Sequence, residues 1–427
     1  SDETIKNALT SKNRSAVIAA RKMAKGKTLD DAFDQANEKE KMFFLNKNPN
    51  IQPHHIDKAI DSGEYLLLVN TANHPLTSSS QLEKILLKVK GSNQYNESSI
   101  KSMVAEHHNT SPKILEKLYN DNDSQQDNID GAIARNPNTP EHIISDFIDR
   151  HDGHSWAMRS ASLNPNLTSK HIEKIITGNT ADSSPDTIKD LIKNHPNIKK
   201  EHLMMALDNS DEGVKMEALK HPESDNEVAQ KGMIDSSYVK EYAASHRSHT
   251  PEQIDKLLDS EDEKIRKGAA RNPNASSKNI FKALDHQDPS VREQALYRRD
   301  LTPEHINHVL KTSKDDWHKR LMAGHPNIDD EGRRMALNSG HIDEYDYPKL
   351  KDSFITKHLS STNPEDHEGA SLLSRKITKP EHFNIAVSHP DDRVRAGLTV
   401  NKNTPPDIKE KLKKDPNETI RKIASYD

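Results

Sequence analysis

The chain has 427 residues, of which 32% are hydrophobic, 4% aromatic and 30% charged, with a formal net charge of −5 and no cysteine. The absence of cysteine excludes disulfides, thiolate nucleophiles, iron–sulfur clusters and cysteine-type zinc sites. The near balance of interspersed charges gives no overall attraction to nucleic acid or anionic membranes. The apolar content is lean for one large core, but it suffices for an array of thin layers that bury their faces against each other.

Residues 1–47 have apolar residues at helical spacing but lack the repeat described below. We expect this segment to be a helical cap on the first repeat, with an anchoring arm for a partner as the alternative. The first residues lack the basic-then-apolar pattern of a signal peptide, and no apolar run reaches the length of a membrane helix. These patterns predict a native terminus after loss of Met, no membrane partner, and a cytoplasmic or virion-associated protein.

From residue 48 to residue 427 a unit of about 26 residues recurs about fourteen times, a period typical of stacked repeat proteins. Its most regular feature is a junction of the type Asn272-Pro273-Asn274, with His or Arg in place of the first Asn in some copies. We number each copy by that first residue: 48, 74, 108, 136, 164, 195, 221, 246, 272, 298, 325, a degenerate copy near 350, 375 and 401.

Each unit is expected to contain two short helices. Asp288 and Pro289 mark the start of the first helix, because Asp caps free amides and Pro needs no hydrogen-bond partner there. Val291 and Ala295 lie four residues apart on one apolar face. The helix is predicted to end at the junction, with Asn in a left-handed cap conformation and Pro preventing continuation. A second helix then starts at sequences such as Thr302-Pro303.

Two stretches resemble the leucine-rich repeat variant family: Ile265-Arg266 through Asn274, and Asp391 through Ile408. The resemblance covers about residues 48–427 and is weakest in residues 60–110 and 340–374. It implies an all-α, right-handed solenoid in which short α- and 3₁₀-helices alternate, used as a binding scaffold without a reaction. The iron–sulfur domain of some members is not implied here, since its cysteines are absent; no cofactor or metal is expected.

The period breaks at residues 88–98, 177–184 and 340–365. Insertions in repeat arrays map to loops and are often used for binding, although drift without function is equally compatible with the sequence.

A basic column precedes the junctions at a fixed spacing of six residues. In stacked layers it could follow a phosphate backbone or an acidic protein surface. Asp residues four positions earlier in the same helices predict instead that the charges pair internally. The column comprises Lys189, Lys215, Lys240, Arg266, Arg292, Lys319, Arg395 and Arg421.

The 24 histidines fall mainly at the junctions and near the starts of second helices, where capping and packing explain them better than metal binding. Many imidazoles titrating near pH 6 would make stability sensitive to pH. Trp156 and Trp317 each stand eight residues before a junction. They could stack on bases, as in DNA glycosylases built on HEAT-like arrays, but packing or anchoring to a surface is favoured.

The pattern as a whole predicts a non-enzymatic scaffold that binds proteins along an extended surface, plausibly within a larger assembly such as a phage virion. The alternative is a nucleic-acid-binding or DNA-glycosylase-like repeat protein that uses the basic column. These two functions differ in whether that column and the tryptophans are exposed and unpaired.

Overall fold

The computed structural model describes residues 1–121, 126–149, 156–178, 184–342 and 347–426. This part of the chain contains 31 α-helices, two short 3₁₀-helices and no strand, so the predicted all-α class is confirmed. Contacts divide the chain into two compact units, Ser1–Gly232 and Met233–Asp427. Each is a stack of short helices in the manner of an α-helical repeat solenoid.

The first unit contains seventeen helices: α1 Asp2–Leu9, α2 Arg14–Met23, α3 Gly26–Gln35, α4 Glu38–Lys47, α5 Pro53–Asp61, α6 Tyr65–Ala72, α7 Ser79–Val89, α8 Gln94–Glu106, α9 Pro112–Asn120, α10 Gln126–Arg135, α11 Glu141–Asp149, α12 Trp156–Ala161, α13 Ser169–Ile176, α14 Pro185–Asn194, α15 Lys200–Ala206, α16 Glu212–Lys220 and α17 Asn226–Gly232.

The second unit continues with α18 Ser237–Ala244, α19 Pro251–Leu258, α20 Glu263–Arg271, α21 Ser277–Leu284, α22 Pro289–Leu296, α23 Pro303–Thr312, α24 Asp316–Ala323, α25 Asp330–Asn338, η1 Tyr347–Lys349, α26 Asp352–Leu359, η2 Pro364–Asp366, α27 His367–Ser374, α28 Pro380–Val387, α29 Asp392–Thr399, α30 Pro406–Leu412 and α31 Glu418–Ala424.

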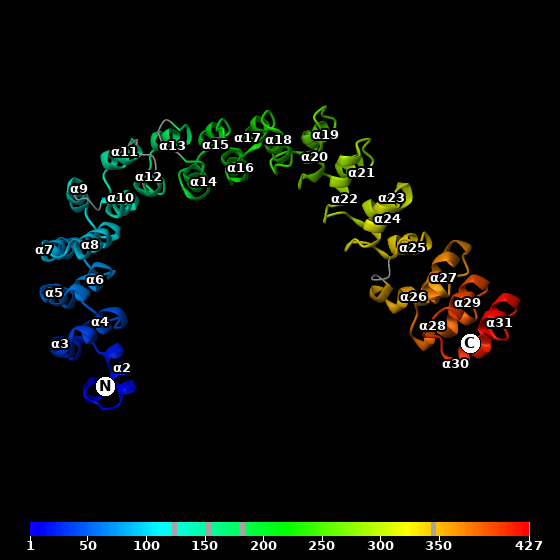
Figure 1. The fold of residues 1–427 in the computed structure, drawn as a ribbon, viewed down its shortest axis with the longest axis horizontal. Helices are drawn as coiled ribbons and strands as arrows, with labels where there is room; N and C mark the ends of the chain where they lie inside the picture. The colour runs from blue at the N-terminus through cyan, green and yellow to red at the C-terminus, as the bar shows by residue number, and fades with distance from the viewer. Residues whose placement is uncertain (122–125, 150–155, 179–183, 343–346, 427) are drawn as a thin grey trace. The chain divides into compact units, whose positions relative to one another are not determined.

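Within each unit the helices form two rows, which Figure 1 shows on the two sides of the ribbon. Even-numbered helices pack against even-numbered neighbours, as in α18, α20 and α22, and odd-numbered helices do the same in α19, α21 and α23. Each helix also packs against its neighbour in sequence across the layer. The core is therefore a continuous apolar strip between the rows, to which each layer contributes residues such as Val291, Ala295 and Ile306, all fully buried.

The first helix of each repeat starts as predicted. Asp288 lies at the N-cap of α22, and its Oδ1 accepts a hydrogen bond from the amide of Ser290 at 3.0 Å. The other expected Asp residues are also N-caps whose side chains accept amides of the first turn: Asp211, Asp262, Asp315 and Asp391.

The junction asparagine works differently from the prediction. Asn272 has φ −59° and ψ 127°, and no described residue other than glycine has positive φ, so a left-handed cap is wrong. Its side chain is buried instead, and Nδ2 donates to the carbonyls of Ala244 and His246 in the preceding repeat at 3.0 and 2.9 Å. Oδ1 accepts the amide of Asn274 at 2.9 Å. The junction thus satisfies the free carbonyls at the end of the previous first helix.

This arrangement explains why His replaces Asn at some junctions. In His195, Nδ1 accepts the amide of Asn197 at 3.2 Å and Nε2 lies 2.8 Å from the carbonyl of Asn164, so one ring supplies both the acceptor and the donor. Arg298 also bridges to the preceding repeat through Nη1, at 2.9 and 2.8 Å from the carbonyls of Ala270 and Asn272. Asn136, Asn164, His325 and Asn401 make the equivalent bonds.

Three further details differ from the sequence analysis. The junction position near residue 108 is held by His107, whose Nε2 lies 3.0 Å from the carbonyl of His74. The second helices are α-helices, as in α19 and α21, and not the expected 3₁₀-helices. The insertion at residues 88–98 mainly lengthens α8 to 13 residues. Most of the insertion at 177–184 lies outside the described residues.

The repeat bonding also begins before residue 48. Nδ2 of Asn48 donates to the carbonyls of Arg21 and Ala24 at 2.7 and 2.9 Å, in the manner of Asn272. Helices α2 to α4 therefore pack as a further layer of the stack, and whether residues 1–47 also anchor a partner stays a prediction.

The period fails between α25 and α26. Here the described residues 339–342 and 347–351, which we call the irregular segment, contain only the short helix η1 where a first helix and its junction were expected. As a result α25 packs both on α23, as a second helix does, and on α27, as a first helix does. The side of the stack that carries second helices before α25 carries the first helices α27, α29 and α31 after it. The degenerate copy near residue 350 is thus the point at which first and second helices change sides.

Candidate binding surfaces

The basic column is largely used inside the protein. Nη1 of Arg266 donates to the carbonyls of Ser260 and Glu261 at 2.8 and 2.9 Å, which closes the loop before its own helix. Nη2 of the same residue bonds to Asp288, the N-cap of the next first helix. This guanidinium lowers the pKa of Asp288 to about 2. One arginine therefore ties two consecutive repeats.

Other members of the column repeat this pattern. Arg395 bonds to Asp415 through Nε at 2.7 Å and to the carbonyl of His389 at 2.7 Å, and Lys240 lies 2.8 Å from Asp262. Arg292, Arg421 and Lys189 also have carbonyl or carboxylate partners, and Lys215 is not a free cation either. Only Lys319 has no side-chain hydrogen bond or ion pair with another residue that the structure describes.

Internal pairing within one helix, four residues apart, was expected but is wrong for Arg266 and Arg395. One oxygen of Asp262 accepts the amide of Lys264 in its own first turn, and the other accepts from Lys240 of the preceding repeat. The second oxygen of Asp391 accepts from Arg393 of its own helix and lies near His367 of the preceding repeat. A single sequence shows which residues share a helix face, but it does not show which residues of the neighbouring layer lie close enough to form an ion pair.

The two tryptophans have different outcomes. The side chain of Trp156 lies outside the described part of the chain. Trp317, in the first turn of α24, is 45% exposed, and its ring contacts that of Tyr297, 60% exposed, with centroids 6.0 Å apart. Trp317 therefore packs against a neighbouring ring at the surface and is not buried, and anchoring to a partner surface stays a prediction.

The sequence analysis missed two tyrosines on the same row. Tyr238 in α18 is 63% exposed and stands eight residues before His246, as Trp317 stands before His325. Tyr297 follows α22 directly and reaches the next repeat. The equivalent spacing of Tyr238 was visible in the sequence. The contact between Tyr297 and Trp317 was not, because it joins neighbouring layers.

Histidines near the starts of second helices act as caps. The amide of Thr302 donates to Nδ1 of His305 at 3.0 Å, and Nε2 lies 2.8 Å from the hydroxyl of Ser277 in the preceding repeat. His171 and His202 have the same two partners, an N-cap amide and a serine hydroxyl. Burial lowers the pKa of all three imidazoles.

One group of side chains has the donor types of a metal site. Asp30 Oδ1 lies 2.8 Å from Nε2 of His54 and 2.9 Å from Nε2 of His55. However, Nδ1 of His55 accepts the amide of Gln52 at 3.0 Å, so in the neutral ring Nε2 carries the hydrogen and faces the carboxylate as a donor. A metal-ligating imidazole instead donates from its other nitrogen. The arrangement therefore fits a helix cap and does not fit a metal ligand set.

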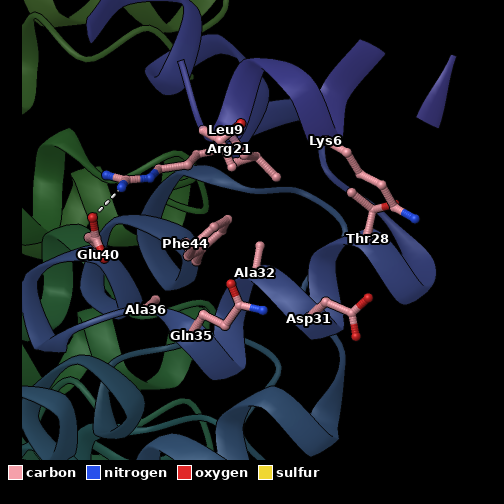
Figure 2. Close-up of a pocket in the computed structure, with 11 residues that line it drawn as sticks. Lys6, Leu9, Arg21, Thr28, Asp31, Ala32, Gln35, Ala36, Glu40 and Phe44 are labelled. Carbon is pink, nitrogen blue, oxygen red and sulfur yellow. Dashed lines mark hydrogen bonds and ion pairs between the residues drawn. The ribbon is translucent and has the colours of Figure 1, made fainter. Parts of the chain in front are cut away.

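A cavity of about 410 Å³ lies among α1, α2, α3 and α4 in the N-terminal segment. Figure 2 shows the ion pair of Arg21 and Glu40 on one side of it and Lys6 and Asp31 on the other, with Phe44 between. The lining combines an apolar patch with charges of both signs. None of these residues was singled out from the sequence, since four separate helices bring them together.

Comparison with known proteins adds little. No protein-family model matches the chain, and no curated protein matches it. One similar solved structure is the crystal structure of an engineered protein from the Northeast Structural Genomics Consortium, which covers 99% of this chain and 97% of its own at 14% identity with a TM-score of 0.18. A likeness at that score carries no argument about function. Among the described residues, no helix has the length and apolar content needed to cross a membrane.

Proposed function

We propose that the chain is a non-enzymatic scaffold that binds protein partners along the row of even-numbered helices in its second unit. The observation that carries the proposal is the exposed pair Tyr297–Trp317, which bridges two repeats, with Tyr238 at the equivalent position of α18. Arg320 lies three residues after Trp317, hence on the same face of α24, and is exposed. Trp, Tyr and Arg are the residues that dominate protein–protein binding energy.

We also propose a role within a larger assembly, such as a phage virion, and a cytoplasmic or virion location. The resemblance to the leucine-rich repeat variant family is part of the same proposal. The bonding between repeats supports the scaffold function, because the junctions, the caps and most of the basic column have partners inside the protein. The exposed aromatic side chains therefore offer apolar surface that a protein partner could bury.

Crosslinking from defined positions tests this proposal. A photoreactive phenylalanine analogue at position 317 of the full chain, irradiated in an extract of the source, is expected to capture a discrete protein partner. The same analogue at exposed Lys311, on the opposite row in α23, serves as the matched control. Capture that is absent, or equal at positions 317 and 311, would refute the proposed surface. Loss of capture in Tyr297→Ala would support it further.

Nucleic-acid binding is the second candidate, favoured by Lys319, which has no hydrogen bond or ion pair among the described residues and lies on the same helix as exposed Trp317. Its prediction is salt-sensitive binding of duplex or single-stranded DNA. Fluorescence anisotropy with both forms of DNA at low and high salt measures this directly. Binding that Lys319→Ala and Trp317→Ala both weaken would favour the candidate, and no salt-sensitive binding would end it.

A further inference from the structure

The irregular segment leaves a cavity of about 430 Å³ in the second unit, between residues 347–350, α26, the end of α27 and the start of α28. Its walls combine the aliphatic side chains of Leu350, Ile355, Leu373 and Ile377 with polar ones, which include the ion pair of Asp352 and Lys379. A volume of this size lies within the range of small-molecule sites, about 300–1,000 Å³.

The cavity lies where the bonding between junctions is interrupted. In regular repeats the first junction residue donates to two carbonyls of the preceding junction, as Asn272 and Asn401 do. At the junction of α27 and α28 this position is Arg375, which makes no such hydrogen bond among the described residues. The second helices α26 and α28 still pack against each other, and the cavity lies beside this junction.

A histidine beside the same junction lacks the hydrogen bond that its equivalent in a regular repeat makes. His382 is the third residue of α28, the position of His305 in α23, and it is 2% exposed. Nε2 of His305 meets the hydroxyl of Ser277. Nε2 of His382, which lines the cavity, is buried and has no hydrogen-bond partner among the described residues. A buried polar nitrogen without a partner is a place for a ligand group.

We propose that this cavity binds a phenolic ring, with its hydroxyl on Nε2 of His382 and its ring between Leu350, Ile355 and Leu373. The hydroxyl is chosen because it both donates and accepts, so it satisfies either tautomer of the imidazole. The position of Ser277, the first residue of α21, is held in α26 by Asp352, which pairs with Lys379, so the phenol would supply the hydroxyl that this repeat lacks. The aliphatic part of the walls suits a flat apolar ring.

Ligand-observed fluorine NMR with the full chain tests the site. 4-Fluorophenol and 4-fluorotoluene have nearly the same size and differ in the hydroxyl. Saturable binding of the phenol to the wild-type chain, at least tenfold tighter than that of the toluene, is expected. Equal binding of the two compounds would show that His382 is not used, and no saturable binding of the phenol would overturn the proposal.

Variants locate the bound ring. Ile355→Trp fills the cavity and is expected to weaken phenol binding at least tenfold, whereas Leu257→Trp, at a half-buried position of α19, is expected to leave it unchanged. His382→Phe keeps the ring but removes the nitrogen, so it should abolish the preference for phenol over toluene. Retained binding in Ile355→Trp would place the site elsewhere. The comparison of the two compounds on wild-type protein decides the proposal even where a variant fails to fold.

N-acetyl-tyrosinamide distinguishes the source of the phenol. Binding as tight as that of 4-fluorophenol indicates a tyrosine side chain presented by a polypeptide. Binding of 4-fluorophenol alone indicates a free small phenol. Because neither result depends on Trp317 or Tyr297, failure here leaves the proposed protein-binding surface untouched, and the reverse also holds.

Discussion

Two neighbouring regions of the second unit show what holds the stack together. In residues 236–338, the junction side chains of Asn272, Arg298 and His325 bond to the preceding layer, and the buried cap His305 has a partner. In the described part of residues 339–379, only the short helix η1 precedes α26, Arg375 makes no junction bond, and a cavity adjoins His382, whose Nε2 has no hydrogen bond. The apolar pattern of the helices is similar in both regions. The difference teaches that close stacking depends on a few polar side chains as well as on apolar burial.

Asn272→Ala is expected to have the largest effect. It removes two buried side-chain bonds and leaves the carbonyls of Ala244 and His246 without them, which costs about 2–5 kcal/mol of unfolding free energy. Urea unfolding of the full chain measures the loss. Arg375→Ala is the control, with an expected change within about 0.5 kcal/mol. Similar losses in both variants would contradict the comparison, and Asn272→His should retain part of the stability.

Gly268→Ala is expected to cost about 1–3 kcal/mol, because an added Cβ would lie 2.1 Å from the backbone oxygen of Glu241 and 2.7 Å from Cβ of Ala244 in α18. Gly369→Ala, in α27, is the counterpart next to the irregular segment. Its new Cβ would lie 2.3 Å from Oδ1 of Asn338, a side-chain atom that can move. Thermal unfolding of the two variants should show the larger loss for Gly268→Ala; the opposite order would refute the argument.

Arg266→Ala is expected to cost about 1–2 kcal/mol, because the loop before α20 and the cap of α22 both lose a charged donor. Lys319→Ala should change the unfolding free energy by less than about 0.5 kcal/mol, since its side chain has no partner among the described residues. Equal losses of unfolding free energy in Arg266→Ala and Lys319→Ala would mean that the ion pair and hydrogen bonds of Arg266 add no stability.

The contribution of Arg266 should also depend on pH. Arg266 is the chief cause that lowers the pKa of Asp288 to about 2, from its ordinary value of 3.8 in the unfolded chain. A depressed carboxyl pKa stabilises the folded state above about pH 4, and this stability is lost as pH falls toward 2. The difference between wild type and Arg266→Ala, measured by urea unfolding, should therefore shrink in this window.

His195→Asn is expected to have the smallest effect on stability, and it tests how the stability of the stack depends on pH. Burial lowers the pKa of His195 below its ordinary value of 6.5. The unfolded chain therefore takes up protons first as pH falls, so stability is complete above about pH 6.5 and declines through the window down to the folded pKa.

Nine further described histidines have pKa values lowered mainly by burial, so the melting temperature of the wild type should fall between about pH 7 and about pH 5. They are His55, His74, His107, His171, His202, His221, His249, His305 and His358. Asn can make the junction bonds of His195 without titrating, so His195→Asn should make this slope slightly shallower. A flat pH profile of the wild type would contradict the prediction.

The period of the apolar residues, the Asp caps and the proline positions were enough to predict a stack of two-helix layers. These features act within one turn of chain, as when Asp288 caps its own helix, so they can be read from spacing alone. The pairing of Arg266 with Asp288 could not be read in that way, because it depends on which layer lies within reach. Likewise, the sequence placed Trp317 and Tyr297 twenty residues apart, with nothing to show that their rings meet.

The sequence by itself determined the helices, their ends and the place where the period fails. Only the tertiary structure decided what the junction asparagines do, since a buried amide such as that of Asn272 acquires its role from the carbonyls of another layer. It also decided that, at the failure near residue 350, α25 packs against the second helix α23 on one side and the first helix α27 on the other. The physical reason is common to both: local preferences act along the chain, whereas burial and hydrogen-bond satisfaction are settled between layers.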